Sequence, residues 1–252
     1  MSVRLASLLL LSGAALVAIG CESTQSKSAR IAEQLGPVKQ EEGLEIDEES
    51  KDIEVLDTTL LSDANGTAVV VRVENTSGQD LANVPIAVNV VDAKGKSVYR
   101  NDLPGLEPAL TSIPLLRAGE TIDWVNNQVL AVGKPDDVEV MVGEGGEPPS
   151  GDLPDLELGD PELENDPVSG INAAGSIVNN GDEQLGRVLL YGVARQGDEI
   201  VAAGRAAIDK LNPGRSRVYH VYFIGDPKGA EVGVAWFPPA DSSEQTTGGT
   251  DG

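Results

Sequence analysis

The sequence is short of the residues that most often carry chemistry. Its 252 residues include one cysteine and one histidine, and aromatic residues make up 3% of the chain. A single cysteine cannot form a disulfide within the chain, and it excludes zinc sites of the multi-cysteine type. A Ser-His-Asp triad would depend entirely on His220. With so few aromatic residues, the cores must consist of Val, Ile, Leu and Ala, which favours small β-sheet cores over large aromatic-lined pockets.

Basic residues are also scarce. The 18 Lys and Arg residues stand against 41 Asp and Glu residues, which gives a formal net charge of -23. Binding of a phosphate backbone requires a basic surface, so nucleic acid is not an expected partner. Electrostatic adhesion to anionic lipid headgroups is disfavoured for the same reason. The simplest interpretation is a solvated acidic surface, and binding of cations or basic partners is the alternative.

Residues 1–20 have the three parts of an export signal. Arg4 supplies a positive charge, residues 5–17 form an apolar stretch, and Ala18-Ile19-Gly20 precedes a cleavage point. The apolar stretch is shorter than the roughly 20 residues that a membrane-spanning helix needs. The lone cysteine, Cys21, follows directly, at the position where a mature N-terminus would begin.

The residues Ala18-Ile19-Gly20-Cys21 resemble the lipobox of bacterial lipoproteins. The resemblance implies cleavage before Cys21 and a diacylglyceryl group on its thiol, often with a further acyl chain. Two or three acyl chains anchor a protein stably, whereas one does not. We therefore expect a protein bound by its lipid to the cell membrane or outer membrane and facing the extracytoplasmic side. The alternative is an ordinary secretory signal followed by an incidental cysteine.

Behind the cysteine, polar connections separate two β-rich units. In each unit, short stretches with apolar residues at every second position alternate with turn residues, as expected for antiparallel sandwiches. The connections are acidic and rich in Ser, Gly or Pro, and they predict no regular structure. The predicted organisation is a signal peptide (1–20), a disordered acidic tether (21–51), a first β-sandwich (52–143), an acidic Pro/Gly linker (144–166), a second β-sandwich (167–238) and a disordered tail (239–252).

The two units share a pattern of residues at identical spacing. The pattern in the first unit is Val73, Asn75, Leu81 and Val84, and in the second it is Ile177, Asn179, Leu185 and Val188. Such self-similarity predicts two copies of one β-unit, with segment 101–114 as an addition to the first copy. An asparagine at a strand-to-loop junction bonds the backbone of its own loop, so a structural role is predicted for both asparagines.

This repeated pattern of strand, Asn-containing polar loop, Leu-x-x-Val, alternating strand and turn resembles FxLYD-type and related Ig-like domains of bacterial extracytoplasmic proteins. The resemblance extends over residues 68–142 and 173–236, and it includes the stretch from Ile86 to Gly95. It implies two tandem antiparallel Ig-like β-sandwiches, hence an all-β fold. It implies no catalytic residue.

Motifs that carry chemistry are missing from the sequence. A Gly-rich phosphate loop between a strand and a helix is not found, nor is a Gly-x-Ser-x-Gly elbow, so no enzyme and no cofactor are predicted. His220 is predicted to point outward from a strand, without a group to orient it. Calcium could bind the linker carboxylates, but their spacing matches no calcium loop, and a solvated spacer without a metal is favoured. These carboxylates are Asp152, Asp155, Asp160 and Asp166.

The second unit holds the richest aromatic region of the chain, which consists of Tyr219, Tyr222, Phe223 and Trp236. These side chains could contact a partner, or they could only cover the rim of a small sandwich. The predicted function is protein interaction or envelope structure, with an envelope protein as partner and no catalysis. The alternative is an envelope protein that binds a small ligand, or an accessory subunit of a transport or secretion assembly. A concave apolar pocket at these aromatics would favour ligand binding, and a flat exposed edge would favour protein contact.

Overall fold

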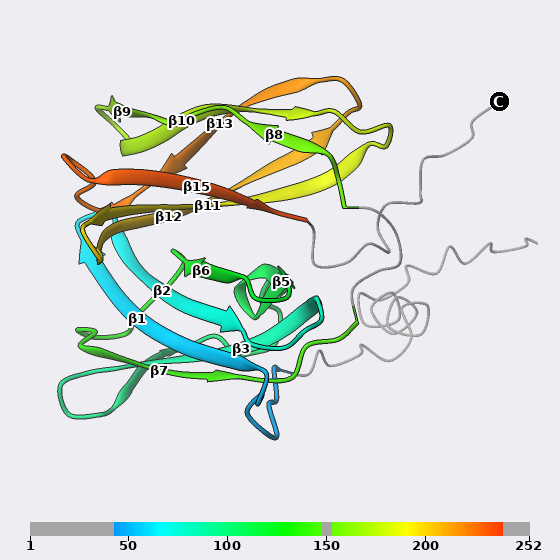
Figure 1. The fold of residues 1–252 in the computed structure, drawn as a ribbon. Helices are drawn as coiled ribbons and strands as arrows, with labels where there is room; N and C mark the ends of the chain where they lie inside the picture. The colour runs from blue at the N-terminus through cyan, green and yellow to red at the C-terminus, as the bar shows by residue number, and fades with distance from the viewer. Residues whose placement is uncertain (1–42, 148–152, 239–252) are drawn as a thin grey trace, which may run out of the picture. The chain divides into compact units, whose positions relative to one another are not determined.

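A computed structural model describes residues 43–147 and 153–238 (Figure 1). The predicted signal peptide, Cys21 and the C-terminal tail lie outside these residues. Of the predicted tether, only residues 43–51 are described, and they contact the first sandwich. Leu44 N donates to Asp102 O at 3.1 Å, and Ser50 N donates to Val142 O at 2.8 Å. No helix in the described residues has the length and apolar character needed to cross a membrane.

The first sandwich consists of two antiparallel sheets. One sheet has the order β1-β2-β6, with β1 (Ile53–Asp63), β2 (Gly66–Asn75) and β6 (Thr121–Asn126). In the other, a long central strand pairs with one strand near its beginning, one near its end, and one along its second half. These are β3 (Leu81–Val91) at the centre, β5 (Ser112–Leu116), β4 (Ser97–Arg100) and β7 (Asp137–Val142), with a 3-10 turn η1 (Pro108–Leu110) between β4 and β5.

The second sandwich also consists of two antiparallel sheets. In one, a central strand pairs with one strand on one side and with two short strands on the other. These are β10 (Gly170–Asn179), β13 (Ser216–Tyr222), β8 (Leu156–Leu158) and β9 (Glu162–Asp166). The other sheet has the order β14-β12-β11-β15, with β14 (Ile224–Gly225), β12 (Glu199–Leu211), β11 (Leu185–Gln196) and β15 (Glu231–Phe237). The predicted all-β fold with two antiparallel sandwiches is confirmed.

The acidic linker differs from its prediction. Residues 144–166 were expected to have no regular structure, but β8 and β9 lie within them and both pair with β10. Without them, one side of the β10 backbone would lack hydrogen-bonding partners, which is costly in a packed structure. Leu156 and Leu158 also pack against the core of the second sandwich. The second sandwich therefore begins before residue 167, and the Gly and Pro residues only keep its first two strands short.

The internal repeat is confirmed at the level of strand register. Leu81 of β3 pairs with Leu116 of β5, and at the matching positions Leu185 of β11 pairs with Leu211 of β12. In the second copy β12 runs without interruption along β11. In the first copy the corresponding path is divided into β4, segment 101–111 and β5. The additional segment of the first copy is therefore an insertion into one long strand.

Asn75 and Asn179 make the same contacts in the two copies. Asn75 Nδ2 donates to the carbonyls of Gln79 and Leu116, at 2.8 and 3.0 Å. Asn179 Nδ2 donates to those of Glu183 and Leu211, at 2.8 and 3.1 Å. Both side chains are fully buried, at 0% and 1% exposure. The predicted structural role of both asparagines is confirmed, because each joins its own loop to the strand across the core.

Candidate functional site between the two sandwiches

Strands β2 and β11 are buried on both faces. Val71 of β2 lies opposite Trp124 in the core of the first sandwich, and the preceding residue, Val70, lies opposite Val125 on the other face. All four side chains are fully buried. On β11, alternate residues divide in the same way. Leu190 and its neighbours at every second position belong to the core of the second sandwich, whereas Leu189, Tyr191 and Val193 belong to a cluster that includes the first core.

This alternation defines an apolar interface between sheets β1-β2-β6 and β14-β12-β11-β15 (Figure 1). Both sheets lie in one compact unit of the chain. An antiparallel sheet that is covered on one face shows apolar and polar residues in alternation, whereas a sheet covered on both faces carries continuous apolar runs. The runs 68–71 and 188–194 have this second pattern, and they are the sequence signal for the interface.

Polar contacts between the described residues of the two sandwiches all have the same direction of charge. The first sandwich supplies the carboxylates, and the second supplies arginines and a backbone amide. Asp123 of β6 pairs with Arg195 of β11. Glu107 lies within 3.3 Å of Arg187 and 3.1 Å of Arg205. A further contact joins the Asp63 carboxylate to the amide of Gly225, at 2.9 Å. Glu107 belongs to the inserted segment 101–114, so the insertion supplies one of the carboxylates that join the two copies.

Two buried side chains with polar groups, Arg205 and Tyr191, lie next to each other beside Glu107. The side chain of Arg205 is 4% exposed, and in the ladder of β11 and β12 it lies opposite Tyr191. Within the described residues, the Tyr191 hydroxyl and Arg205 Nη1 have no hydrogen-bond partner. Burial raises the pKa of Tyr191 well above its usual value, so the phenol is neutral. Burial also raises the pKa of Tyr99, whose hydroxyl accepts a hydrogen bond from Asn126 Nδ2 at 3.0 Å.

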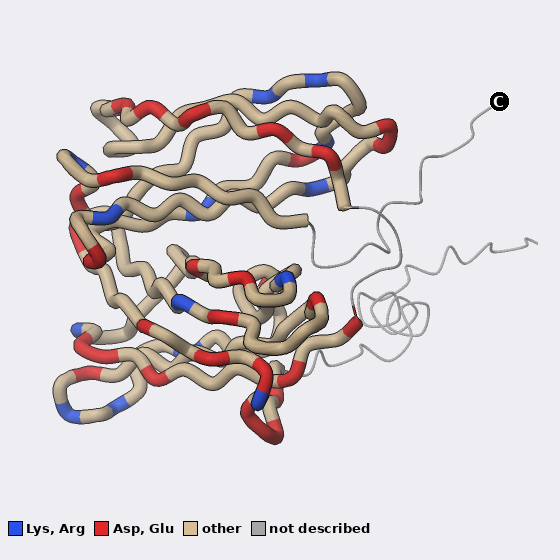
Figure 2. Tube along the Cα trace, in the orientation of Figure 1, with Lys and Arg blue, Asp and Glu red and all other residues tan. Residues whose placement is uncertain are grey.

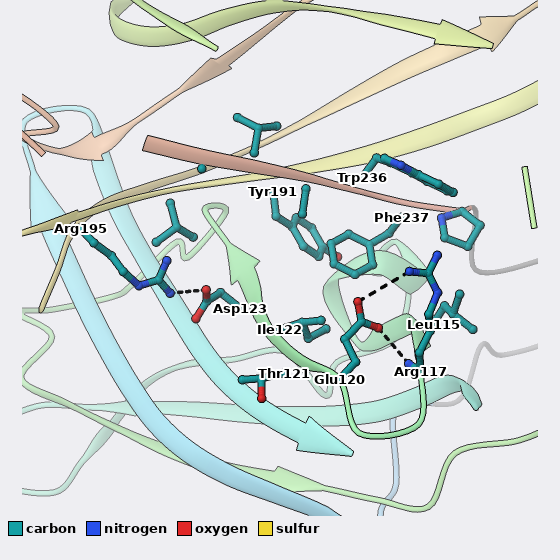
Figure 3. Close-up of a pocket in the computed structure, with 15 residues that line it drawn as sticks. Leu115, Arg117, Glu120, Thr121, Ile122, Asp123, Tyr191, Arg195, Trp236 and Phe237 are labelled. Carbon is teal, nitrogen blue, oxygen red and sulfur yellow. Dashed lines mark hydrogen bonds and ion pairs between the residues drawn. The ribbon is translucent and has the colours of Figure 1, made fainter. Parts of the chain in front are cut away.

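A groove of about 260 Å³ opens at one side of the interface, between β6 of the first sandwich and β11 and β15 of the second (Figure 3). It exists because β15 presents Gly233 and Ala235 toward the first sandwich, where larger residues would fill the space. A Cβ atom at Gly233 would meet nothing within 4 Å. The rings of Tyr191 and Phe237, with centroids 4.7 Å apart, form one wall.

The charged groups of the groove are paired with one another. At one end Arg117 lies 4.0 Å from Glu120, and its backbone N donates to the same carboxylate at 3.0 Å. At the other end lies the pair of Asp123 and Arg195 (Figure 3). Each arginine has a carboxylate beside it, which weakens its attraction for an anionic ligand. The groove therefore carries polar ends around an apolar floor, with its charges balanced.

The structure does not bring the four predicted contact aromatics together on one surface. Tyr219 and Phe223 are 1% and 3% exposed and belong to the core of the second sandwich. Tyr222 is 38% exposed on β13, and Trp236 lies on β15 of the other sheet, where it lines the groove. Strand alternation sends Tyr219 inward and Tyr222 outward, so these residues do not share one contact surface.

His220 points outward from β13, as predicted. Its Nδ1 lies 3.1 Å from Asn172 Oδ1 and 3.8 Å from Glu164, and its ring stacks on Tyr222 with centroids 6.4 Å apart. An exposed ring on a flat sheet lacks the enclosure that makes a histidine a useful general base. In residues 43–147 and 153–238, no three His, Cys, Asp or Glu side chains gather as metal ligands. Asp152 of the proposed calcium set lies outside the described residues.

The charged and small residues that build the interface and the groove carry no signal in the sequence by which they could be predicted. Glu107, Asp123 and Arg195 are single charges in segments without a motif, and their pairing across two copies depends on tertiary structure alone. Gly233 and Ala235 are small residues in an otherwise ordinary strand. Neither the models of protein families nor the curated proteins give a match to this chain.

Proposed function

We propose that this protein is a lipid-anchored protein of the bacterial cell envelope, with two Ig-like modules that serve protein interaction or envelope structure without catalysis. The observation that carries the anchor is the position of the only cysteine. Cys21 directly follows a segment with the composition of an export signal. The acidic residues behind it, and the net charge of -23, keep the folded part soluble and dispersed outside the membrane.

The geometry of the described residues supports protein interaction over binding of a small ligand. Pockets for drug-sized ligands have volumes of roughly 300–1,000 Å³. The groove between the sandwiches, at about 260 Å³, is smaller and has paired charges at both ends. The sheets instead offer strand edges to a partner, and strand edges are a common means of peptide recognition.

Replacement of Cys21 by serine tests the anchor. The Cys21→Ser variant should leave the membrane fraction and should no longer incorporate an alkyne-labelled fatty acid, because the acyl chains supply the membrane affinity. Ser23→Ala, two residues away, is the matched control and should remain in the membrane fraction with its label. Unchanged membrane retention of Cys21→Ser would refute lipid anchoring.

Cross-linking in intact cells tests the interaction. A photo-reactive residue placed at exposed positions of both sandwiches should yield the same specific adduct from independent preparations. Exposed positions on different sheets include Thr58, Glu139, Ser216 and Ala235. The absence of a specific adduct at every position would count against an interaction role, even if the lipid anchor is confirmed.

A further inference from the structure

Among the described residues, strand β15 forms an edge without a second partner strand. It is the last strand of its sheet and pairs with β11 along its seven residues without a register shift. Between Val232 and Phe237 it contains no charged residue and no proline, and its trace in Figure 2 carries no charge after its first residue. An edge strand with these properties offers a row of backbone N–H and C=O groups for pairing with another chain.

The other edges in the described residues each carry a feature that disfavours pairing. β1 has a bulge between Val55 and Asp57. β5 contains Pro114, β7 carries Asp137 and Glu139, and β13 carries Arg217. The remaining edge strands are either shorter or charged: β4, β6, β8, β9 and β14. Natural sheets use bulges, charges, proline and short strands in this way. β15 has one charge, Glu231 at its first residue, and its remaining six residues carry none of these features.

The groove lies beside this edge. Gly233 and Ala235 are exposed and face the first sandwich, where they leave the groove open. A strand added to β15 would continue the sheet, with alternate side chains on the groove side. A volume of about 260 Å³ suits one large side chain better than a whole organic ligand. Edge and groove together therefore match an extended peptide segment.

The charges favour a basic occupant. Arg117 and Arg195 at the groove are neutralised by Glu120 and Asp123. Glu231, at the start of β15, is exposed. With a formal net charge of -23, the chain attracts a cationic segment and repels a second copy of itself.

We propose that the edge of β15 receives an extended, basic segment of a partner protein as an added strand, with one of its side chains in the groove. This inference rests on the proposed interaction function and names the surface and the partner chemistry. Backbone pairing with β15 supplies affinity, and the groove together with the acidic surroundings supplies selectivity.

The test uses the full-length protein in detergent micelles and two synthetic heptapeptides, one of alternating Lys and Val and one of alternating Glu and Val. Peptide binding is measured by fluorescence anisotropy, and hydrogen exchange locates the bound strand. The Lys/Val peptide should bind and slow amide exchange in β15. Ala235→Lys should weaken binding at least tenfold, because the longer side chain fills the groove and its charge repels the Lys/Val peptide. Ser216→Lys, on the edge strand β13, adds the same charge elsewhere and should bind like the original chain.

Several outcomes would overturn the proposal: no binding of the Lys/Val peptide, equal binding of the Glu/Val peptide, slowed exchange at a strand other than β15, or a dimer that forms through β15. These outcomes are separable from failure of the proposed function. If cross-links at Thr58, Glu139 or Ser216 capture a partner while Ala235 captures none, the interaction function stands and strand addition at β15 is refuted. If no position captures a partner, the interaction function itself fails.

Discussion

Glu107 and Arg205 form an ion pair, 3.1 Å long, between the two copies of the repeat. The pair joins an insertion that only the first copy has to a strand that only the second copy keeps intact. The Arg205 side chain is 4% exposed, whereas that of Glu107 is 46% exposed. A buried guanidinium is costly unless a carboxylate accompanies it, so Glu107 of the insertion compensates the burial of Arg205.

Glu107→Gln should therefore destabilise the protein by about 1–3 kcal/mol. The figure lies below that for a fully buried pair because Glu107 is half exposed to water. Chemical denaturation monitored by tryptophan fluorescence gives the free energy of unfolding. Glu54→Gln, on the exposed part of β1, removes the same charge and should change stability by less than about 0.5 kcal/mol. Equal stabilities of the two variants would show that Glu107 does not support Arg205.

Asn75 and Asn179 make equivalent hydrogen bonds, so replacing either one should destabilise the protein by the same amount. Asn75→Ala and Asn179→Ala each leave one buried strand carbonyl and one part-buried loop carbonyl without their side-chain donor, and each should lower the free energy of unfolding by about 2–4 kcal/mol. Asn→Asp at either site should be no milder, because a carboxylate keeps the acceptor but loses both donors. Asn180→Ala is the neighbouring control. Its side chain is exposed and makes one contact of 3.3 Å to Glu157, so it should cost little. Unequal costs at Asn75 and Asn179 would contradict their equivalence.

The repeat and both sandwiches could be predicted from the sequence because they depend on local patterns. Strand alternation and turn residues are local, and the spacing from Asn75 to Leu81 recurs unchanged from Asn179 to Leu185. The short strands β8 and β9 could not be predicted in this way. Their residues alternate weakly, and they are strands because β10 needs hydrogen-bond partners on that side.

The interface between the sandwiches is less predictable from the sequence than the strands are. Its only local signal is the run of apolar residues in β2 and β11, which by itself fits a strand buried in any environment. Which sheets meet depends on single residues such as Glu107 and Asp123, and their partners lie 98 and 72 positions along the chain. The groove follows from that packing together with two small residues of β15, so it could not be seen before the packing was known.

Tyr191→Phe should stabilise the protein. The Tyr191 hydroxyl is buried, and no hydrogen-bond partner for it exists among the described residues, so the phenol is desolvated without compensation. Removal of an unpaired buried polar group recovers its desolvation cost, about 1–3 kcal/mol, while the ring keeps its contact with Phe237. Thermal denaturation near neutral pH measures the change. Tyr99→Phe is the contrasting variant, since its hydroxyl accepts from Asn126, and it should destabilise. A clear destabilisation of the Tyr191→Phe variant would contradict this prediction, because it would show that the Tyr191 hydroxyl makes a hydrogen bond in the folded protein.

Stability should fall at alkaline pH, and Tyr191 should account for part of the fall. Burial raises the pKa of Tyr191 in the folded protein, whereas tyrosine in an unfolded chain ionises near pH 10. Its contribution is therefore fully present below about pH 10 and is lost as the pH rises from there toward the folded-state pKa, because only the unfolded chain releases the proton. Each such tyrosine adds at most about 1.4 kcal/mol of lost stability per pH unit. Denaturation between pH 8 and 11.5 should show a shallower decline for Tyr191→Phe than for the original chain. The exposed Tyr222→Phe variant is the control and should follow the original chain, and identical slopes for all three proteins would mean that the Tyr191 phenol ionises as readily folded as unfolded.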